Sequence, residues 1–218
     1  MMAASTVRRG RGVIWGLVAI CAGVEAILLM ADLGLLGAPR LRQKAYEWAG
    51  FWPGLLQGWR PNYPGQGAAM FATYGFLHGG PLHLAVNMVT LWSLGGAVLD
   101  RVGSRGFAVL YTASLLGGAA GFGLLAETFR PMVGASGALF GLAGGLLAWN
   151  YIDRFTFRES LWPVVRIVLF LVAMNVAMWW ALDGQLAWQT HLGGFVAGGL
   201  VALALRPKTQ GPRRSSGS

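Results

Sequence analysis

Six long apolar runs, separated by more polar segments, occupy most of this chain of 218 residues. An α-helix needs about 20 residues to cross the roughly 30 Å of hydrocarbon in a bilayer, and each run is close to that length. Only 11% of the residues are charged, too few to cover the surface of a water-soluble domain. The sequence therefore predicts an all-α polytopic membrane protein. Its six transmembrane helices are expected at residues 13–31, 81–99, 106–126, 133–152, 161–182 and 187–205.

The polar segments divide the chain into a membrane domain, residues 13–205, and two basic tails. Residues 1–12 are expected to form a cytoplasmic tail, and residues 206–218, rich in Pro, Lys, Arg, Gly and Ser, a disordered one. A long outer loop, at about residues 32–80, joins the first two helices and is rich in Trp, Pro and Gly. Such aromatic residues favour the headgroup layer of a bilayer.

The net charge of +9 arises from basic residues between the apolar runs and in the tails. This distribution is typical of an integral membrane protein, and no basic face that would bind nucleic acid is predicted. Placing both termini in the cytoplasm puts eleven of the 17 basic residues inside, as the positive-inside rule favours. We expect a bacterial inner membrane protein in this orientation. The single cysteine, Cys21, excludes a disulfide within the chain and a cysteine-based metal site, and we expect no metal or cofactor.

Three reactive side chains, His83, Ser136 and His191, are predicted to lie at one depth. The second, fourth and sixth helices run in the same direction, and these residues lie 17, 17 and 15 positions before charged residues at the inner ends. Those markers are Asp100, Asp153 and Arg206. At a rise of 1.5 Å per residue, all three side chains lie about 22–26 Å above the inner boundary, a few ångströms below the outer surface.

Glycine stripes on two of these helices favour a close approach of their backbones. They are Gly137, Gly141 and Gly145 beside Ser136, and Gly194 and Gly198 on the face of His191. If the fourth helix packs on the sixth, the Ser136 hydroxyl and the His191 imidazole come within hydrogen-bond reach. A base beside a hydroxyl is the arrangement that activates a nucleophile. No carboxylate is expected at the same depth, so the sequence predicts a catalytic dyad.

Two further polar residues share one face of the second helix. His83 and Asn87 are spaced i, i+4, and with the Ser136 N–H they can donate hydrogen bonds to a developing oxyanion. His78 is a candidate supporting residue for that site or for the loop. Asn175, midway along the fifth helix, is expected to form an interhelical hydrogen bond.

Three motifs in order make the chain resemble the rhomboid family of intramembrane serine proteases. GASGALFGLAGG is similar to the family's GxSG motif, HLAVN to its HxxxN motif and HLGGFVAG to its HxxGxxxG motif, and LGGAVLDRVGS resembles the end of the family's second helix. These segments are Gly134–Gly145, His83–Asn87, His191–Gly198 and Leu94–Ser104. The resemblance covers about residues 75–205 and implies a six-helix rhomboid bundle.

The resemblance also implies an activity and the residues that carry it. The Ser136/His191 dyad would cleave transmembrane segments of other membrane proteins near the outer face, with His83 and Asn87 at the oxyanion. Gly134 belongs to the nucleophile motif, and Phe140 stands where some relatives have a tyrosine packed on the catalytic histidine. Many relatives carry a Trp-Arg pair roughly a dozen residues before the HxxxN histidine, a place that reads Ala68-Ala69-Met70 here. The one Trp-Arg pair of this sequence, Trp59-Arg60, is not assigned to that position.

Two alternatives of other classes stay open from the sequence. One is a rhomboid-like protein without activity that binds membrane clients; such relatives usually lack the serine or the histidine, and this chain has both Ser136 and His191. The other is a haem protein with His83 and His191 as axial ligands, which would show a Soret band.

Overall fold

The computed structural model describes residues 11–205 and 207, where every regular element is a helix. The tails predicted at 1–12 and 206–218 lie outside the described residues, apart from positions 11, 12 and 207. The long helices of the described part are α2 (Gly12–Asp32), α5 (Pro81–Leu125), α6 (Ser136–Thr156), α7 (Trp162–Ala181) and α8 (Trp188–Ala204). Between α2 and α5 lie α3 (Leu41–Ala49), η1 (Pro53–Leu56), α4 (Gln66–Thr73) and η2 (Tyr74–Phe76).

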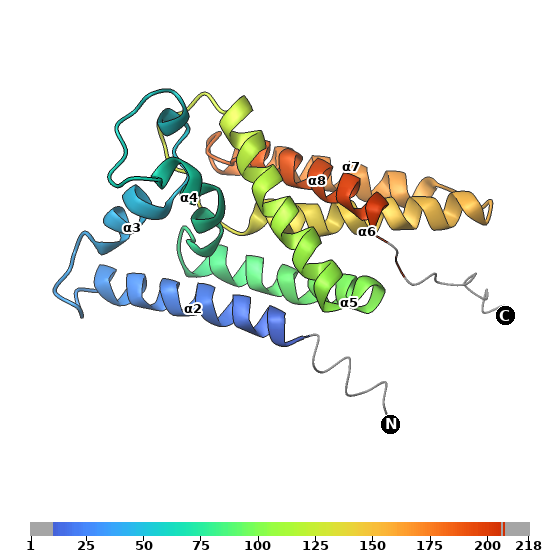
Figure 1. Cartoon of the computed structure of the whole chain (residues 1–218), viewed down its shortest axis with the longest axis horizontal. Coiled ribbons are helices and arrows are strands. Elements are labelled where there is room, and N and C mark those ends of the chain that lie inside the picture. Colours follow the sequence, from blue (N-terminus) through green and yellow to red (C-terminus); the bar gives the residue numbers. More distant parts are fainter. Residues whose placement is uncertain (1–10, 206, 208–218) are drawn as a thin grey trace.

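The second and third predicted helices form one element, α5, which bends at Gly103. This glycine has φ 71° and ψ −177° and is the one non-helical residue inside α5. A side chain is strained at such a φ, whereas glycine adopts it readily. The sequence predicted a polar linker at residues 100–105, but a single glycine makes the turn. Figure 1 shows the first arm of α5 running beside α2 and the second arm crossing the bundle.

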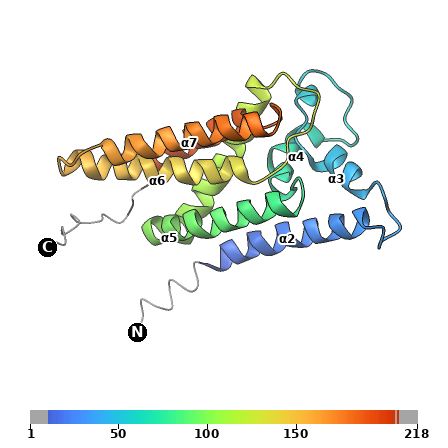
Figure 2. The ribbon, with the colours of Figure 1, turned by 180° about the vertical axis from the view of Figure 1, so that it is seen from behind.

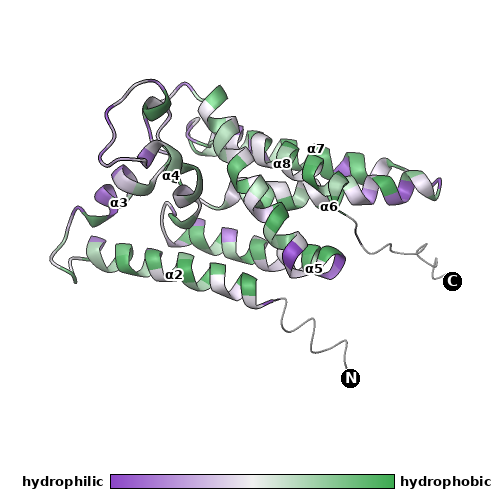
Figure 3. Cartoon of the chain, viewed as in Figure 1, coloured by the Kyte–Doolittle hydropathy of each residue, from purple (hydrophilic) through white to green (hydrophobic). Residues whose placement is uncertain are grey.

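Three of the long helices meet the length and composition needed to cross a membrane. α2, α5 and α7 contain windows with a mean hydropathy of 2.3, 1.6 and 2.0. Hydrophilic residues gather at the ends of the long helices and in α3 (Figure 3). The chain is therefore an integral membrane protein. Helices also cover the other predicted runs, but α8 has only 17 residues and α6 is rich in glycine, so the count of six spans stays a prediction.

An ion-paired arginine ties the segment between α2 and α5 to the bundle. Arg42 of α3 lies with Nη2 2.8 Å from Glu25 Oε1 and Nε 2.7 Å from Asp32 Oδ2, both on α2. Its Nη1 also donates to the His78 carbonyl at 3.1 Å. The side-chain hydrogen bonds to Glu25 raise the pKa of the Arg42 guanidinium most, and the bond to Asp32 raises it further. A buried acid inside an apolar helix thus has a cationic partner, as such a group requires.

Aromatic side chains anchor the same segment in the core. Phe51 and Tyr74 are fully buried, and Phe51 packs edge-on against both Tyr74 and Phe122 of α5. The Tyr74 hydroxyl donates to the Leu115 carbonyl at 2.7 Å. The connection between α2 and α5 is therefore packed into the bundle by short helices. Its placement in the outer leaflet of a membrane remains a prediction.

Glycines on α6 and α8 bring the two helix backbones into direct contact. A Cβ atom added to Gly194 would overlap the Gly137 carbonyl, and one added to Gly198 would overlap the Gly141 carbonyl. Gly145, lower on α6, faces Leu110 and Ala202. α7 lies beside α6 (Figure 2), and none of its 20 residues is buried. The centre of the bundle is thus made by α5, α6 and α8, with α7 at its edge.

His78 lies in the short link before α5 and is fully buried. Its ring meets that of His83 edge-on, with 5.3 Å between the centroids. Burial, together with the neighbouring His83, lowers the pKa of His78 from 6.5 to about 4. His78 is therefore neutral at pH 7, and protonating it requires a charge in the protein interior.

We expect Gly198→Ala to destabilise the bundle by about 1–3 kcal/mol, because the added methyl group collides with the backbone of α6. Unfolding in SDS from a mild detergent, followed by tryptophan fluorescence, measures this change. Gly199→Ala is the matched control, because its Cβ would meet only the Gly144 carbonyl at 3.8 Å, an ordinary contact. Equal unfolding midpoints for the two variants would contradict the close backbone packing.

We expect the stability of the fold to fall as the pH drops from about 6.5 to 4. The pKa of His78 is about 4 in the folded protein against 6.5 unfolded, so the folded state binds fewer protons in this window. The stabilisation is fully present above pH 6.5, and the free energy of unfolding is expected to have fallen by about 3 kcal/mol at pH 4. SDS unfolding between pH 7 and 4 measures it. His78→Phe is expected to flatten the dependence, and an unchanged slope in this variant would rule out His78 as the source.

Candidate active site

Ser136 is the first residue of α6 and follows a turn that requires glycine at position 134. Gly134, two residues earlier, has φ 125°, and its N–H donates to the Tyr74 carbonyl at 3.0 Å. A Cβ atom on Gly134 would lie 2.8 Å from Cε1 and 3.0 Å from Nε2 of His83. Both the backbone angle and the space therefore require glycine here. The turn lets the chain enter α6 with the imidazole of His83 packed on its backbone.

His191 of α8 lies against Ser136. Its Nε2 atom is 2.9 Å from Ser136 Oγ, which is hydrogen-bond distance. The imidazole is 7% exposed and stacks on Phe140, with 4.1 Å between centroids and 8° between planes. The close approach at Gly194, three residues after His191, explains why side chains from two different helices meet at this point. The arrangement can pass a proton from a hydroxyl to an imidazole.

His83 and Asn87 lie on the first arm of α5. His83 Nδ1 accepts a hydrogen bond from the Gly79 N–H at 3.1 Å, so the neutral ring carries its proton on Nε2, the atom near Gly134. Asn87 is 3% exposed, and its Nδ2 donates one hydrogen bond to the His83 carbonyl at 3.0 Å. The amide keeps a second hydrogen for another acceptor. The structure thus places the His83 donor at the turn that leads to Ser136.

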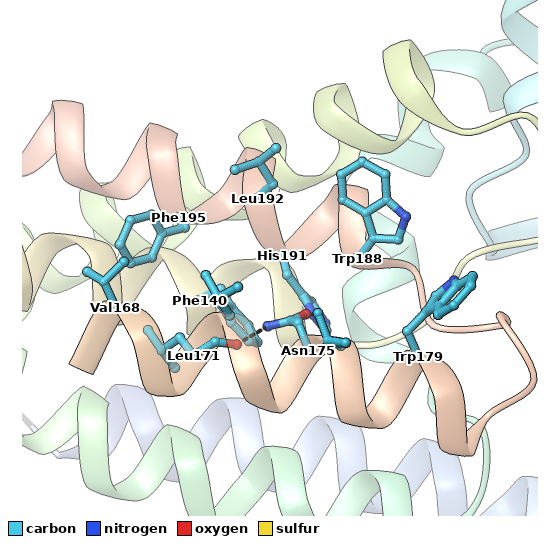
Figure 4. A pocket seen from close by; sticks show the side chains of 11 residues that line it. Phe140, Val168, Leu171, Asn175, Trp179, Trp188, His191, Leu192 and Phe195 are labelled. Carbon is cyan, nitrogen blue, oxygen red and sulfur yellow. Dashed lines mark hydrogen bonds between the residues drawn. The ribbon is translucent and has the colours of Figure 1, made fainter. Parts of the chain in front are cut away.

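Asn175 forms a contact whose partner the sequence did not reveal. Its Oδ1 atom lies 2.6 Å from His191 Nδ1, and its Nδ2 donates to the Leu171 carbonyl at 2.9 Å (Figure 4). The expected interhelical hydrogen bond thus goes to the histidine. The sequence predicted no third member, because no carboxylate lies at the depth of Ser136 and His191. The signal in the sequence was an isolated amide inside the apolar run 161–182.

A cavity of about 470 Å³ opens between α7 and the α6–α8 pair, beside His191 and Asn175. Figure 4 shows the surrounding side chains, which are almost all apolar. Apart from the two polar residues they are Phe140, Val168, Leu171, Val172, Val176, Trp179, Trp188, Leu192 and Phe195. The histidine thus sits at the border between the packed bundle and an apolar space.

The geometry disfavours axial haem ligation by His83 and His191. Both ring nitrogens of His191 are within hydrogen-bond distance of a protein group, Ser136 or Asn175. In His83 the Nδ1 atom accepts a backbone hydrogen bond, and Nε2 faces Gly134. Axial ligation would therefore require His191 to give up its contact with Ser136 or with Asn175.

Comparison with known proteins agrees with the motifs. The model of the Rhomboid domain matches residues 57–208. RHOMBOID-like protein 5 of Arabidopsis thaliana is 34% identical over 138 residues, which cover 61% of this chain and 43% of that protein. RHOMBOID-like protein 4 of the same plant is 35% identical over 130 residues, covering 60% and 32%.

Rhomboid protease GluP of Bacillus subtilis is 32% identical over 129 residues, which cover 59% of this chain and 24% of that protein. The chain thus matches less than half the length of each of these relatives. The domain match covers most of the chain and includes all four residues of the three motifs, His83, Asn87, Ser136 and His191. The resemblance inferred from those motifs is therefore confirmed, and the chain belongs to the rhomboid family.

Proposed function

We propose that this chain is an intramembrane serine protease that cleaves transmembrane segments of other membrane proteins with a Ser136/His191 dyad. The observation that carries the proposal is the 2.9 Å distance between His191 Nε2 and Ser136 Oγ. Membership of the rhomboid family and the likeness to a relative named Rhomboid protease GluP support it. The substrates are membrane proteins, which reach the site within the bilayer.

In the first step, Ser136 Oγ attacks the carbonyl carbon of the scissile peptide bond. His191 Nε2 accepts the hydroxyl proton and then gives it to the leaving amine, so the bond between carbon and nitrogen breaks and an acyl ester remains on Ser136. In the second step, a water molecule gives a proton to His191 and attacks the ester. His191 returns that proton to Ser136 Oγ as the bond between carbon and Oγ breaks, so Ser136 leaves as the alcohol and the acid product is released.

The carbonyl oxygen becomes negative in both steps and needs hydrogen-bond donors. We assign this role to His83 Nε2–H, the free amide hydrogen of Asn87 and the Ser136 backbone N–H. Donors fixed in a site of low polarity stabilise such a charge more than water does, because they need no reorganisation. The Gly79 N–H, which fixes the tautomer of His83, and the Gly134 turn support the arrangement.

The predicted depth of Ser136 and the distribution of basic residues support cleavage at one particular side of the membrane. With both termini in the cytoplasm of a bacterial cell, Ser136 lies near the outer face of the inner membrane. Cleavage then occurs close to the outer end of the substrate helix. The peptide bond must leave its helix before it can be attacked, so helix-weakening residues such as glycine favour cleavage there.

A client-binding rhomboid-like protein is the second candidate. Such a role requires neither a hydroxyl nor a base, yet Ser136 and His191 lie within hydrogen-bond distance, and Phe140 stacks on the imidazole. These contacts favour the protease. Turnover of a substrate separates the two candidates, because a binding protein captures its client without cleaving it.

We expect Ser136→Ala to lower cleavage of a co-reconstituted single-span membrane protein about 10³-fold or more, because the attacking oxygen is lost. Cleavage in proteoliposomes, followed by gel and mass spectrometry, measures the effect. A fluorophosphonate probe is expected to label the parent protein at Ser136 and to leave the variant unlabelled. Ser93→Ala, an exposed position of α5, is the matched control. Cleavage by Ser136→Ala at the parental rate would refute the proposal.

We expect Asn87→Ala to lower kcat about 10²-fold and to leave KM nearly unchanged, because the lost donor acts on charge that exists only in the transition state. Thr90→Ala is the control on the same arm of α5, since its exposed hydroxyl bonds only the Val86 carbonyl of its own helix. Steady-state kinetics in proteoliposomes compare the two variants. A rise in KM without loss of kcat would show that Asn87 binds substrate instead.

A further inference from the structure

The amide of Asn175 has only one orientation that satisfies both of its partners. The Leu171 carbonyl accepts hydrogen bonds and cannot donate, so the atom 2.9 Å from it must be the NH₂ group. The other end of the amide, Oδ1, therefore faces His191 Nδ1 at 2.6 Å. A backbone carbonyl of α7 thus decides which end of the amide meets the histidine.

An amide oxygen only accepts hydrogen bonds, so the short contact requires a proton on His191 Nδ1. A neutral imidazole carries one ring proton, and Nε2 is then left with its lone pair. That lone pair faces Ser136 Oγ at 2.9 Å, where it can accept the hydroxyl proton. The opposite tautomer would place two acceptors, Nδ1 and Oδ1, 2.6 Å apart and would point Nε2–H at the nucleophile.

We propose that Asn175 is a positioning residue that fixes His191 in the Nδ1–H tautomer and so keeps Nε2 free to take the proton of Ser136. The inference rests on the proposed protease function and adds a third member to the dyad. The carbonyl dipole of Asn175 also faces the positive charge that His191 gains when Ser136 attacks. Phe140 fixes the ring plane by stacking, and Asn175 fixes the rotation within that plane.

Because Asn175 belongs to α7, its contact with His191 depends on where α7 lies relative to α8. α7 has no buried residues, and Asn175 lines the apolar cavity that separates it from the α6–α8 pair. The described contacts between α7 and the rest of the bundle include this one hydrogen bond to the proposed base. A displacement of α7 away from α8 would therefore remove the acceptor from His191.

The first test needs no substitution. The full chain, labelled with ¹⁵N-histidine and held in detergent micelles near pH 8, is studied by long-range ¹H–¹⁵N correlation, which distinguishes the two tautomers. His191 is assigned as the signal lost in His191→Gln. The Nδ1–H form is expected in the parent, and the Nε2–H form would overturn the inference even if the protein cleaves its substrate. Conversely, the Nδ1–H form in a protein that cleaves nothing would overturn the proposed function.

The second test compares variants of Asn175. Asn175→Leu, similar in volume but without an acceptor, is expected to give a mixture of tautomers and to lower kcat about 10–100-fold. Asn175→Asp keeps an acceptor and is expected to hold the Nδ1–H form and to recover at least half of the lost activity. Asn150→Leu, the same change at an amide that accepts from Arg154, is the control and is expected to leave the His191 signal unchanged.

A purely structural role of Asn175 gives a different result. Asn175→Leu would then lose stability in SDS unfolding while the tautomer of His191 and kcat of the folded fraction stay as in the parent, and this outcome would overturn the inference. If Asn175→Leu does not fold, the tautomer of His191 is compared between Asn175→Asp and the parent. Loss of the Nδ1–H form in Asn175→Asp, which keeps the acceptor, also overturns the inference.

Discussion

The direct contact between the backbones of α6 and α8 is the constraint on which the candidate site depends. Gly194 meets the Gly137 carbonyl, and Gly198 meets the Gly141 carbonyl. Ser136 and His191 each lie within one helical turn of this contact, so the helix separation sets the distance between their side chains. A side chain at Gly194 or Gly198 would push α8 away from α6 and would carry His191 away from Ser136. The glycines therefore determine the 2.9 Å between Oγ and Nε2.

Several polar groups inside this apolar bundle have partners that also order the chain. The Trp149 indole donates to the Ala202 carbonyl at 2.8 Å and links α6 to α8, and Arg42 joins α3 to the buried Glu25 of α2. In a membrane interior an unpaired polar group is costly, so such bonds fix positions as well as supplying energy. The Arg42 contacts also hold the segment before α5 against α2.

The sequence predicted the helical class and the common depth of Ser136 and His191 by counting, and the glycine stripes favoured the close helix approach that lets the two side chains meet. Apolar run length gives the helices, and a fixed rise per residue gives the depth of each side chain. The bend at Gly103 was not predicted, because a polar segment between two apolar runs indicates a loop of unknown length. The partner of Asn175 was not predicted either. Its depth was open to calculation, but which helix lies beside α7 depends on packing in three dimensions.

The glycine contact between α6 and α8 also limits how the chain can change over generations. Where two side chains pack together, enlarging one can be offset by shrinking the other. Here both members of each pair are already glycine, and the atoms that meet are main-chain carbonyls. A larger residue at Gly194 has no facing side chain to trim, so no suppressor mutation at Gly137 can restore the fit. Reversion, or a shift of an entire helix, is the only route back.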